Sequence, residues 1–186
     1  MEVISTEELK KQFDVNVFSA LEFSKGLLNE LENGKILNVS SMSSFGIFPF
    51  IAPYCASKRT LDVLFNLMQL EFKRNIKIVS LKLGSVATHI WSKSIKSNQQ
   101  TFDKCSEYTS EMEFLVNNAM KNETKGIPIK KIVNKIVKID SKQNPNVSYT
   151  IGFDAKCAEI FSHLPQQIIN NIVDYRLKNI RKTCVH

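Results

Sequence analysis

The sequence contains 186 residues, of which 43% are hydrophobic and 23% are charged, and its formal net charge is +7. This composition is typical of a single globular domain that is long enough to bury a core. It argues against a membrane or secreted protein, because no apolar run approaches about eighteen residues and the opening MEVISTEELK contains no hydrophobic stretch.

The positive charge raises the question of a nucleic acid or an anionic membrane surface as partner. Six lysines lie between Lys121 and Lys138. At helical spacing, charged and aliphatic residues separate onto two sides, Lys131, Lys135 and Lys138 on one and Ile132, Val133, Ile136 and Val137 on the other. This pattern is typical of a surface helix with a solvated outer side. No nucleic-acid-binding motif accompanies it, so we predict no nucleic-acid partner.

The cysteines and histidines are scattered. The sequence contains no C-x-x-C pair among Cys55, Cys105, Cys157 and Cys184. We therefore predict free thiols and a cytoplasmic protein. His89, His163 and His186 form no ligand-spaced cluster with one another or with the cysteines, and we predict no metal site.

The first predicted element is a long amphipathic helix from about Thr6 to Asn33. Ser5 and Glu8 match a capping box at its start, and apolar residues recur along it at helical spacing. Asn16 lies near its middle and, taken alone, has the character of an ordinary helix-surface asparagine. An apolar strand follows from Lys35 to Ser40.

A loop from Met42 to Pro53 follows the strand. It contains one glycine and two prolines, which predicts an irregular path. Its apolar side chains either line a lipophilic substrate pocket or pack against the next helix, and the sequence favours neither. These side chains are Phe45, Ile47, Phe48, Phe50 and Ile51.

The next helix, from about Tyr54 to Lys73, contains the residue pair with the most specific chemistry. Residues four apart lie on one helical face, so the Lys58 ammonium lies beside the Tyr54 phenol. At about 4 Å and an effective dielectric of about 20, that charge favours phenolate by up to about 4 kcal/mol, which moves the phenol pKa toward neutrality. Such a tyrosine exchanges a proton with an alcohol or carbonyl oxygen that a strand-end serine can hold. A cofactor must then supply the hydride.

An apolar strand from Ile76 to Leu83 follows the helix. Strand, helix and strand within about fifty residues predict a βαβ unit with a parallel sheet and a right-handed crossover. Ligands of such sheets bind beyond the carboxyl ends of the strands, where Ser41 and Gly84 fall.

The chain from 89 to 126 begins polar and poorly periodic and becomes helical around Tyr108 to Lys121. Trp91 either packs over a substrate or closes the core. His89 with Ser41 would suggest a hydrolytic triad, but no GxSxG elbow or acidic orienter accompanies them.

Three short signals follow the lysine-rich helix. Asn144-Pro145-Asn146 predicts a turn, and Val147 to Ile151 predicts a short strand. Residues from Gln166 to Ile180 predict an amphipathic helix.

Together these residues resemble the short-chain dehydrogenase/reductase family. The family's Tyr-x-x-x-Lys signature falls on Tyr54-Cys55-Ala56-Ser57-Lys58, and its catalytic serine, thirteen residues before the tyrosine, falls on Ser41. The asparagine of its catalytic tetrad falls on Asn16, where the resemblance implies a helix kink and a water-mediated link to the lysine. Gly84, Val86 and Thr88 fall in a segment similar to the family's Pro-Gly-x-Val-x-Thr, with Leu83 in place of the proline.

The resemblance implies an α/β fold. Residues 1–186 would form one incomplete domain, the last three strands and flanking helices of a doubly wound, Rossmann-type parallel sheet. Residues from about 89 to 125 would be the mobile substrate lid. The tail from Tyr149 onward is similar to members that act on retinoids, steroids and other lipophilic alcohols.

The resemblance also implies a reaction, the interconversion of an alcohol and a carbonyl with NAD or NADP. In it, Tyr54 is the general acid/base, Lys58 lowers its pKa and contacts the nicotinamide ribose, Ser41 orients the substrate oxygen, and Asn16 supports a proton relay. The cofactor-binding residues it implies are Tyr54, Lys58, Gly84, Val86 and Thr88.

One part of the family pattern is absent from this sequence. Members begin with a glycine-rich Thr-Gly-x-x-x-Gly-x-Gly turn that seats the pyrophosphate on a helix amino terminus. The six glycines here never lie within seven residues of one another. The sequence therefore predicts the carboxyl-terminal portion of such an enzyme: a truncated product, an incomplete gene model or one half of a split enzyme. Its first strand would expose an edge.

Two functions from different classes remain open at this point. The first is an NAD(P)-dependent oxidoreductase that works on a small, lipophilic alcohol or carbonyl, as a homo-oligomer or with the missing amino-terminal half. The second is a catalytically silent remnant or interaction module that does not bind the dinucleotide alone.

Overall fold

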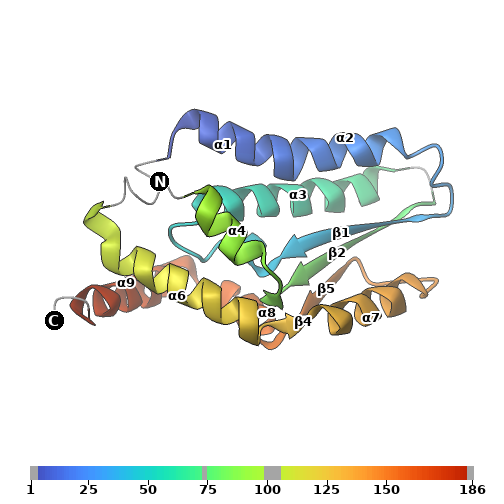
Figure 1. Cartoon of the computed structure of the whole chain (residues 1–186). Helices are drawn as coiled ribbons and strands as arrows, with labels where there is room; N and C mark the ends of the chain where they lie inside the picture. Colours follow the sequence, from blue (N-terminus) through green and yellow to red (C-terminus); the bar gives the residue numbers. More distant parts are fainter. Residues whose placement is uncertain (1–3, 73–74, 99–105, 184–186) are drawn as a thin grey trace.

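The computed structural model of the chain describes residues 4–72, 75–98 and 106–183. Three parallel strands form its main sheet, in the order β1-β2-β5, and Figure 1 shows them pointing the same way. These strands are β1 (Lys35–Ser41), β2 (Lys77–Leu83) and β5 (Ser148–Ile151). The register runs from Lys35↔Lys77 to Ser41↔Leu83 between β1 and β2. The predicted α/β fold with a parallel sheet is confirmed.

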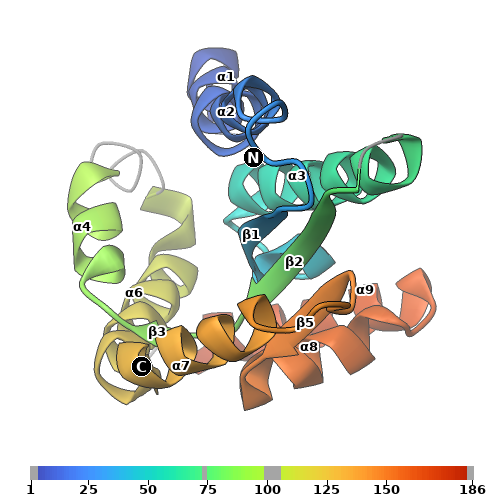
Figure 2. The same cartoon turned by 90° about the vertical axis from the view of Figure 1, so that its right-hand side faces the viewer.

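Helix α3 (Ala52–Glu71) covers one face of this sheet, and α1 (Thr6–Phe13) and α2 (Ser19–Gly26) lie outside it (Figures 1 and 2). Between α1 and α2 the chain forms a π-helical turn, η1 (Asp14–Phe18). The core on this face is apolar and joins Leu61 and Phe65 of α3 to Ile76 and Ile78. Burial of this apolar surface holds the helix layer on the strands.

The first helix begins as predicted and ends earlier. The Ser5 hydroxyl accepts a hydrogen bond from the Glu8 amide at 3.1 Å, and the Glu8 carboxylate accepts one from the Ser5 amide at 2.7 Å, which confirms the capping box. The helix ends at Gly26 rather than near Asn33. Asn33 instead takes a left-handed conformation (φ 60°) in the turn that leads into β1.

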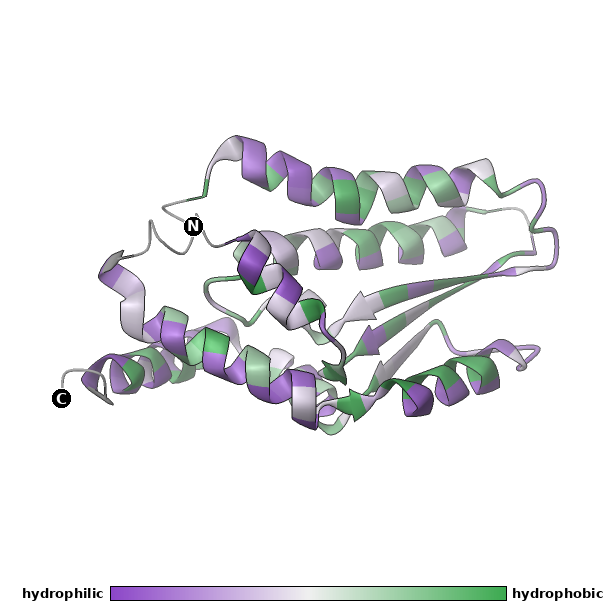
Figure 3. Ribbon diagram, in the orientation of Figure 1, coloured by the Kyte–Doolittle hydropathy of each residue, from purple (hydrophilic) through white to green (hydrophobic). Residues whose placement is uncertain are grey.

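The opposite face of the sheet packs against α7 (Ile129–Asp140). Val79, Leu81 and Ile151 of the strands form a buried cluster with Ile132 and Ile139 of this helix. Figure 3 shows hydrophobic residues of α7 toward the sheet and hydrophilic ones away from it.

One detail of the predicted amphipathic pattern of α7 is wrong. Val133 and Val137 are 49% and 61% exposed, whereas Ile132, Ile136 and Ile139 face the core. The buried stripe is therefore narrower than predicted and is set by isoleucines three and four residues apart. The lysines at positions 131, 135 and 138 are exposed, as the sequence indicates.

Several elements were not predicted. These include the two-residue strands β3 (Val86–Ala87) and β4 (Ile127–Pro128), which pair in parallel, and helix α4 (Ile90–Ser97). Helix α6 (Thr109–Lys125) confirms the helix predicted around Tyr108 to Lys121. The two short strands form the base of a side arm, α4 and α6, which stands apart from the sheet in Figure 2. The short η3 (Ser106–Tyr108) leads into α6. Helix α8 (Phe153–Ser162) follows β5, and α9 (Gln166–Thr183), which was predicted, packs against α6.

Within the described residues, nothing pairs with the outer edge of β1. Val39 in that strand is 53% exposed. This open edge is what the sequence predicts for a sheet whose first strand has no neighbour. In the described part of the chain, no helix has both the length and the hydropathy needed to cross a bilayer.

Candidate active site

The predicted site residues Ser41, Tyr54 and Lys58 come together at the carboxyl end of β1. The Ser41 side chain is close enough to the Tyr54 phenol to lower its pKa. The Lys58 ammonium lies 5.8 Å from the centroid of the Tyr54 ring and 3.4 Å from the carbonyl oxygen of Val39, so it is on the same side of α3 as the phenol. A hydroxyl, a phenol and a cation therefore meet at one place, as the spacing predicted.

The backbone between β1 and α3 explains this convergence. Strand β1 ends at Ser41, whose side chain accepts a hydrogen bond from the Ser43 amide at 3.1 Å and so starts the short helix η2 (Met42–Phe45). Gly46, at φ 77°, closes η2 in a conformation that favours glycine. Pro53 then stands in the first turn of α3, where its missing N–H costs nothing. Tyr54 thus enters the helix opposite the strand end.

The structure corrects the predicted acidity of Tyr54. Burial raises the pKa of the Tyr54 phenol above its ordinary value, and the nearby Ser41 side chain offsets only part of this rise. Burial also lowers the pKa of Lys58. The rise in the Tyr54 pKa caused by removal of the phenol from water is larger than any lowering by the Lys58 ammonium, which lies 5.8 Å from the ring centroid. The predicted shift of this pKa toward neutrality is therefore wrong for this chain.

Asn16 also reaches this part of the fold. It lies in the π-helical turn η1, which is a break in the helix at the implied place. Its side-chain amide donates to the Ser57 hydroxyl at 3.0 Å, and that hydroxyl donates to the Tyr54 carbonyl at 2.8 Å. Ser57 is fully buried. The direct partner of Asn16 is therefore the serine between Tyr54 and Lys58.

Gly84 begins the segment predicted to contact the cofactor. It follows Leu83, the register partner of Ser41, so the two residues lie at the same edge of the sheet. A side chain at position 84 would collide with the carboxylate of Asp154. That carboxylate accepts hydrogen bonds from the amides of Ser85 at 2.7 Å and Ala155 at 2.9 Å.

The other two predicted cofactor-binding residues follow in the chain. Val86 lies in β3, pairs with Ile127 and packs partly into the core. Thr88 is half-buried between β3 and α4. Ser41 and Gly84 lie at the carboxyl ends of their strands, where parallel α/β sheets bind ligands. The sequence has no glycine-rich turn for a pyrophosphate.

The side arm is held by a separate cluster. The Glu123 carboxylate lies 2.6 Å from Nδ1 of His89 and accepts hydrogen bonds from the amide and hydroxyl of Ser92 at 3.0 and 3.2 Å. These bonds lower the pKa of Glu123, with the His89 contact as the largest cause. His89 thus pairs with Glu123 and is 86% exposed, which does not match a hydrolytic pairing with Ser41.

The apolar loop before α3 is half-buried at each of the five predicted positions. The Phe50 ring packs edge-on against Tyr108 at the start of α6, with ring centroids 5.7 Å apart. The loop therefore contacts the side arm as well as α3.

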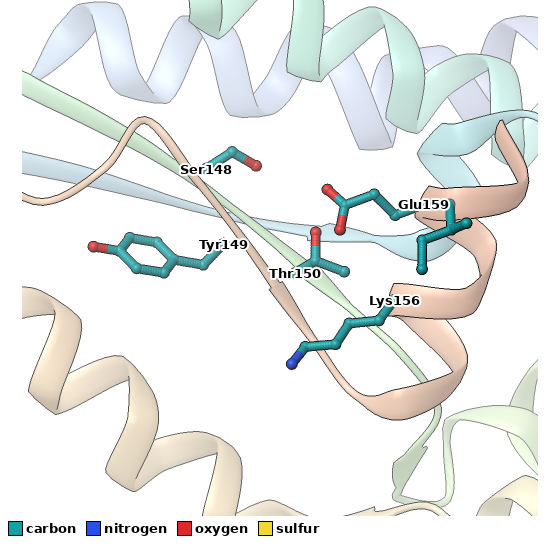
Figure 4. A pocket seen from close by; sticks show the side chains of 6 residues that line it. Ser148, Tyr149, Thr150, Lys156 and Glu159 are labelled. Atoms are coloured by element: carbon teal, nitrogen blue, oxygen red, sulfur yellow. The ribbon is translucent and has the colours of Figure 1, made fainter. Parts of the chain in front are cut away.

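An open hollow lies elsewhere, between β5 and α8. Figure 4 shows Lys156 and Glu159 reaching from α8 toward Ser148, Tyr149 and Thr150 of the strand. None of the predicted site residues lines it. Across the described residues, no three His, Cys, Asp or Glu side chains group as metal ligands, and Cys55 and Cys157 are free thiols. Cys105 and Cys184 lie outside the described residues.

Residues 1–99 match the sequence model of the family described as short chain dehydrogenase. The chain belongs to this family of oxidoreductases, and the three strands of its main sheet, β1, β2 and β5, have a Rossmann-type arrangement.

The relatives are longer than this chain. An uncharacterized oxidoreductase of Bacillus subtilis, YusZ, is 29% identical over 88% of the chain and 60% of its own length. An NADPH-dependent 3-dehydrocapnine reductase of Ornithobacterium rhinotracheale is 24% identical over 80% of the chain and 55% of its own length. The chain thus spans a little over half of the length of these curated relatives.

A solved structure agrees on the fold. A short-chain dehydrogenase from Streptomyces avermitilis superposes on 98% of this chain and 64% of its own chain with a TM-score of 0.62, at 16% sequence identity.

Two residues that support the site were missed in the sequence. Ser57 was recognised only as a position within the Tyr54–Lys58 motif. A serine hydroxyl in a helix often donates a hydrogen bond to the carbonyl three or four residues earlier, as Ser57 does to Tyr54, so the sequence could have suggested this bond. Asp154 gave no usable signal, because its partners at positions 84 and 85 are about seventy residues away in the chain.

Proposed function

We propose that this chain is the catalytic and substrate-binding portion of an NAD(P)-dependent oxidoreductase that interconverts an alcohol and a carbonyl. One observation carries the proposal. The Ser41 side chain lies beside the Tyr54 phenol and lowers its pKa, and the Lys58 ammonium lies over the same ring at 5.8 Å from its centroid. This arrangement can hold an oxygen atom and move a proton to or from it.

In the proposed reaction, Tyr54 is the general acid/base. During reduction its hydroxyl donates a proton to the substrate oxygen, and during oxidation the phenolate takes that proton back. Ser41 donates a hydrogen bond to the same oxygen and fixes its position. The bound dinucleotide supplies or accepts the hydride.

Lys58 stabilises the phenolate that forms when Tyr54 gives up its proton. Burial opposes ionisation of this phenol, so a nearby cation has more to offset than it would at the surface. Asn16 holds the first turn of α3 in place through Ser57, because the Asn16 amide and the Tyr54 carbonyl share that hydroxyl. We assign Tyr54, Lys58, Gly84, Val86 and Thr88 to the nicotinamide end of the dinucleotide.

The choice between NAD and NADP stays open. One relative is named as NADPH-dependent, which favours NADPH as the first cofactor to test. We propose a lipophilic substrate because the apolar loop at positions 45–51 is half-buried and touches the side arm at Phe50 and Tyr108. Residues from about 89 to 125 would form the lid, of which 99–105 lie outside the described residues.

A second candidate function is a catalytically silent remnant or interaction module. The open edge of β1 and the exposed Val39 favour it, because both suit contact with another polypeptide. We expect the amino-terminal half of such an enzyme, or a second copy of this chain, as partner. We place the protein in the cytoplasm on its scattered thiols.

Isothermal titration of the chain with NADH and NADPH tests the proposal. We expect weak or no binding to the chain alone, and micromolar binding of one of the two once a separately expressed amino-terminal half is added. Turnover of a lipophilic alcohol by that mixture would support the oxidoreductase. If the mixed halves bind neither dinucleotide, the silent module is the better account.

A further inference from the structure

A buried polar cluster that the proposed reaction does not use lies next to Lys58. Asp62 is one helical turn after Lys58 on α3, and Asn38 and Ser80 are register partners in β1 and β2. The Asn38 amide donates to Oδ1 of Asp62 at 3.0 Å and to the Ser80 hydroxyl at 3.2 Å. Asn38 and Ser80 are 6% and 8% exposed. The cluster thus ties α3 to both strands of the site.

Both N–H hydrogens of the Asn38 side chain are used in these two bonds. Asp62 is therefore fixed through one oxygen. Its second oxygen, Oδ2, is buried and has no hydrogen-bond partner within the described residues. A buried acceptor without a partner is unfavourable, and more so when it is charged.

A tie between helix and sheet does not need a carboxylate here. An asparagine at position 62 would accept the same hydrogen bond from Asn38 through its amide oxygen and would bury no charge. A nearby cation would offset the cost of this negative charge, and Lys58 lies four residues earlier on the same helical face. Both side chains are half-buried, where their attraction is weakly screened.

We propose that Asp62, held by Asn38, is a positioning residue for Lys58: its half-buried carboxylate is the counter-charge that keeps the ammonium cationic at the carboxyl end of β1. The part of this inference that concerns turnover rests on the proposed function. Burial lowers the pKa of Lys58 and the charge of Asp62 raises it, so the two effects oppose each other. Burial raises the pKa of Tyr54 and of Cys55 beside the site, so both are neutral at physiological pH. Two further cations lie against η2: Arg59 of α3 donates to the Ser44 carbonyl, and Lys82 of β2 lies over the Phe45 ring.

The direct test is to measure the pKa of Lys58 in the full chain by NMR of its labelled side chain. The Lys58→Arg variant identifies which resonance belongs to Lys58. Asp62→Asn keeps the shape of the side chain and removes its charge. We expect the pKa of Lys58 to fall by about half a unit or more in this variant. Glu71→Gln removes an exposed carboxylate from the same helix and should leave it unchanged.

An unchanged Lys58 pKa in folded Asp62→Asn would overturn the inference. If Asp62→Asn does not fold, Asp62→Ser provides the same test, because its hydroxyl can still accept from Asn38. Asp62→Glu restores the charge, and we expect it to recover most of the wild-type pKa of Lys58.

The enzyme completed with its amino-terminal half provides a second readout. The descending limb of its pH profile should move to lower pH in Asp62→Asn, because Lys58 loses its proton earlier, whereas a purely structural loss would lower the rate at every pH. The two proposals fail separately. A Lys58 pKa that responds to Asp62 in a chain that never turns over contradicts the proposed reaction and leaves the charge pair in place.

Discussion

The α3 face of the sheet and the side arm differ in how they are held together. Around Tyr54 and Lys58, the polar side chains that form hydrogen bonds are largely removed from water: Ser57 is fully buried, and Asn38 and Ser80 are nearly so. In the arm, the cluster that joins α4 to α6 depends on Glu123 and on His89, which is 86% exposed. The first region is assembled by buried bonds between neighbouring elements, whereas the bond that joins α4 to α6 includes a histidine that water and protons reach.

This difference fits the distinct tasks that we propose for the two regions. A proton-transfer site must hold its atoms within a few tenths of an ångström before substrate arrives, which buried and fully bonded polar groups achieve. An arm that covers a substrate must open, and elements that open have few buried contacts. We therefore expect mutations on the α3 face to affect stability and rate together, and changes in the arm to affect mainly its attachment.

The largest effect is expected at the junction of the two regions. Gly84→Ala places a methyl group against the Asp154 carboxylate, which cannot move aside because it accepts bonds from the amides of Ser85 and Ala155. We expect a loss of about 3 kcal/mol in the free energy of unfolding, measured by urea denaturation. Gly26→Ala is the matched control, because nothing lies within 4 Å of the added methyl. An equal loss in both variants would show that the junction is not tightly packed.

A smaller effect is expected inside the α3 face. Ser57→Ala leaves the Asn16 amide without its acceptor and the Tyr54 carbonyl without its donor. We expect a loss of about 1–2 kcal/mol in the free energy of unfolding and a lower rate in the completed enzyme. Ser19→Ala removes an exposed serine bond in α2 and should change neither quantity much. If the Ser57→Ala variant is as stable and as active as the parent, Asn16 does not support the site through Ser57.

The smallest effect is expected in the arm, and it depends on pH. The pKa of Glu123 is lowered in the folded protein, mainly by His89. A lowered carboxyl pKa contributes stability above the ordinary glutamate pKa, and this contribution is lost as the pH falls through the lowered value. The Ser92 amide resonance should report this titration, and His89→Asn should move it to higher pH.

His163→Asn is the control for this titration, because His163 bonds the Glu159 carbonyl and not a carboxylate. If the Ser92 amide follows the same curve in wild type and in His89→Asn, the arm is held by other contacts.

The sequence predicted the parts of the site that depend on spacing along one element. Tyr54 and Lys58 share a helical face, and Ser41 ends a strand that feeds that helix, so their meeting follows from local geometry. The parallel sheet followed from the strand, helix, strand order in the same way. The roles of the predicted residues in catalysis and cofactor binding stay predictions.

What the sequence could not predict depends on contacts between distant segments. The short strands β3 and β4 exist because residues 86 and 127 meet, and Asp154 supports position 84 from about seventy residues away. The predicted acidity of Tyr54 was wrong for a related reason. The spacing of residues in the sequence predicts which charge lies near the phenol. The burial of the phenol, which has the largest effect on its pKa, depends on the whole fold.

The most direct measurement is the turnover of Tyr54→Phe in the enzyme completed with its amino-terminal half, compared with Tyr149→Phe. The Tyr149 hydroxyl accepts hydrogen bonds from Asn146 and Lys142, which precede its own strand in the chain, and Tyr149 lines the hollow away from the site. We expect a loss of kcat of at least about 100-fold for Tyr54→Phe and no loss for Tyr149→Phe. Undiminished turnover by a folded Tyr54→Phe variant would contradict it.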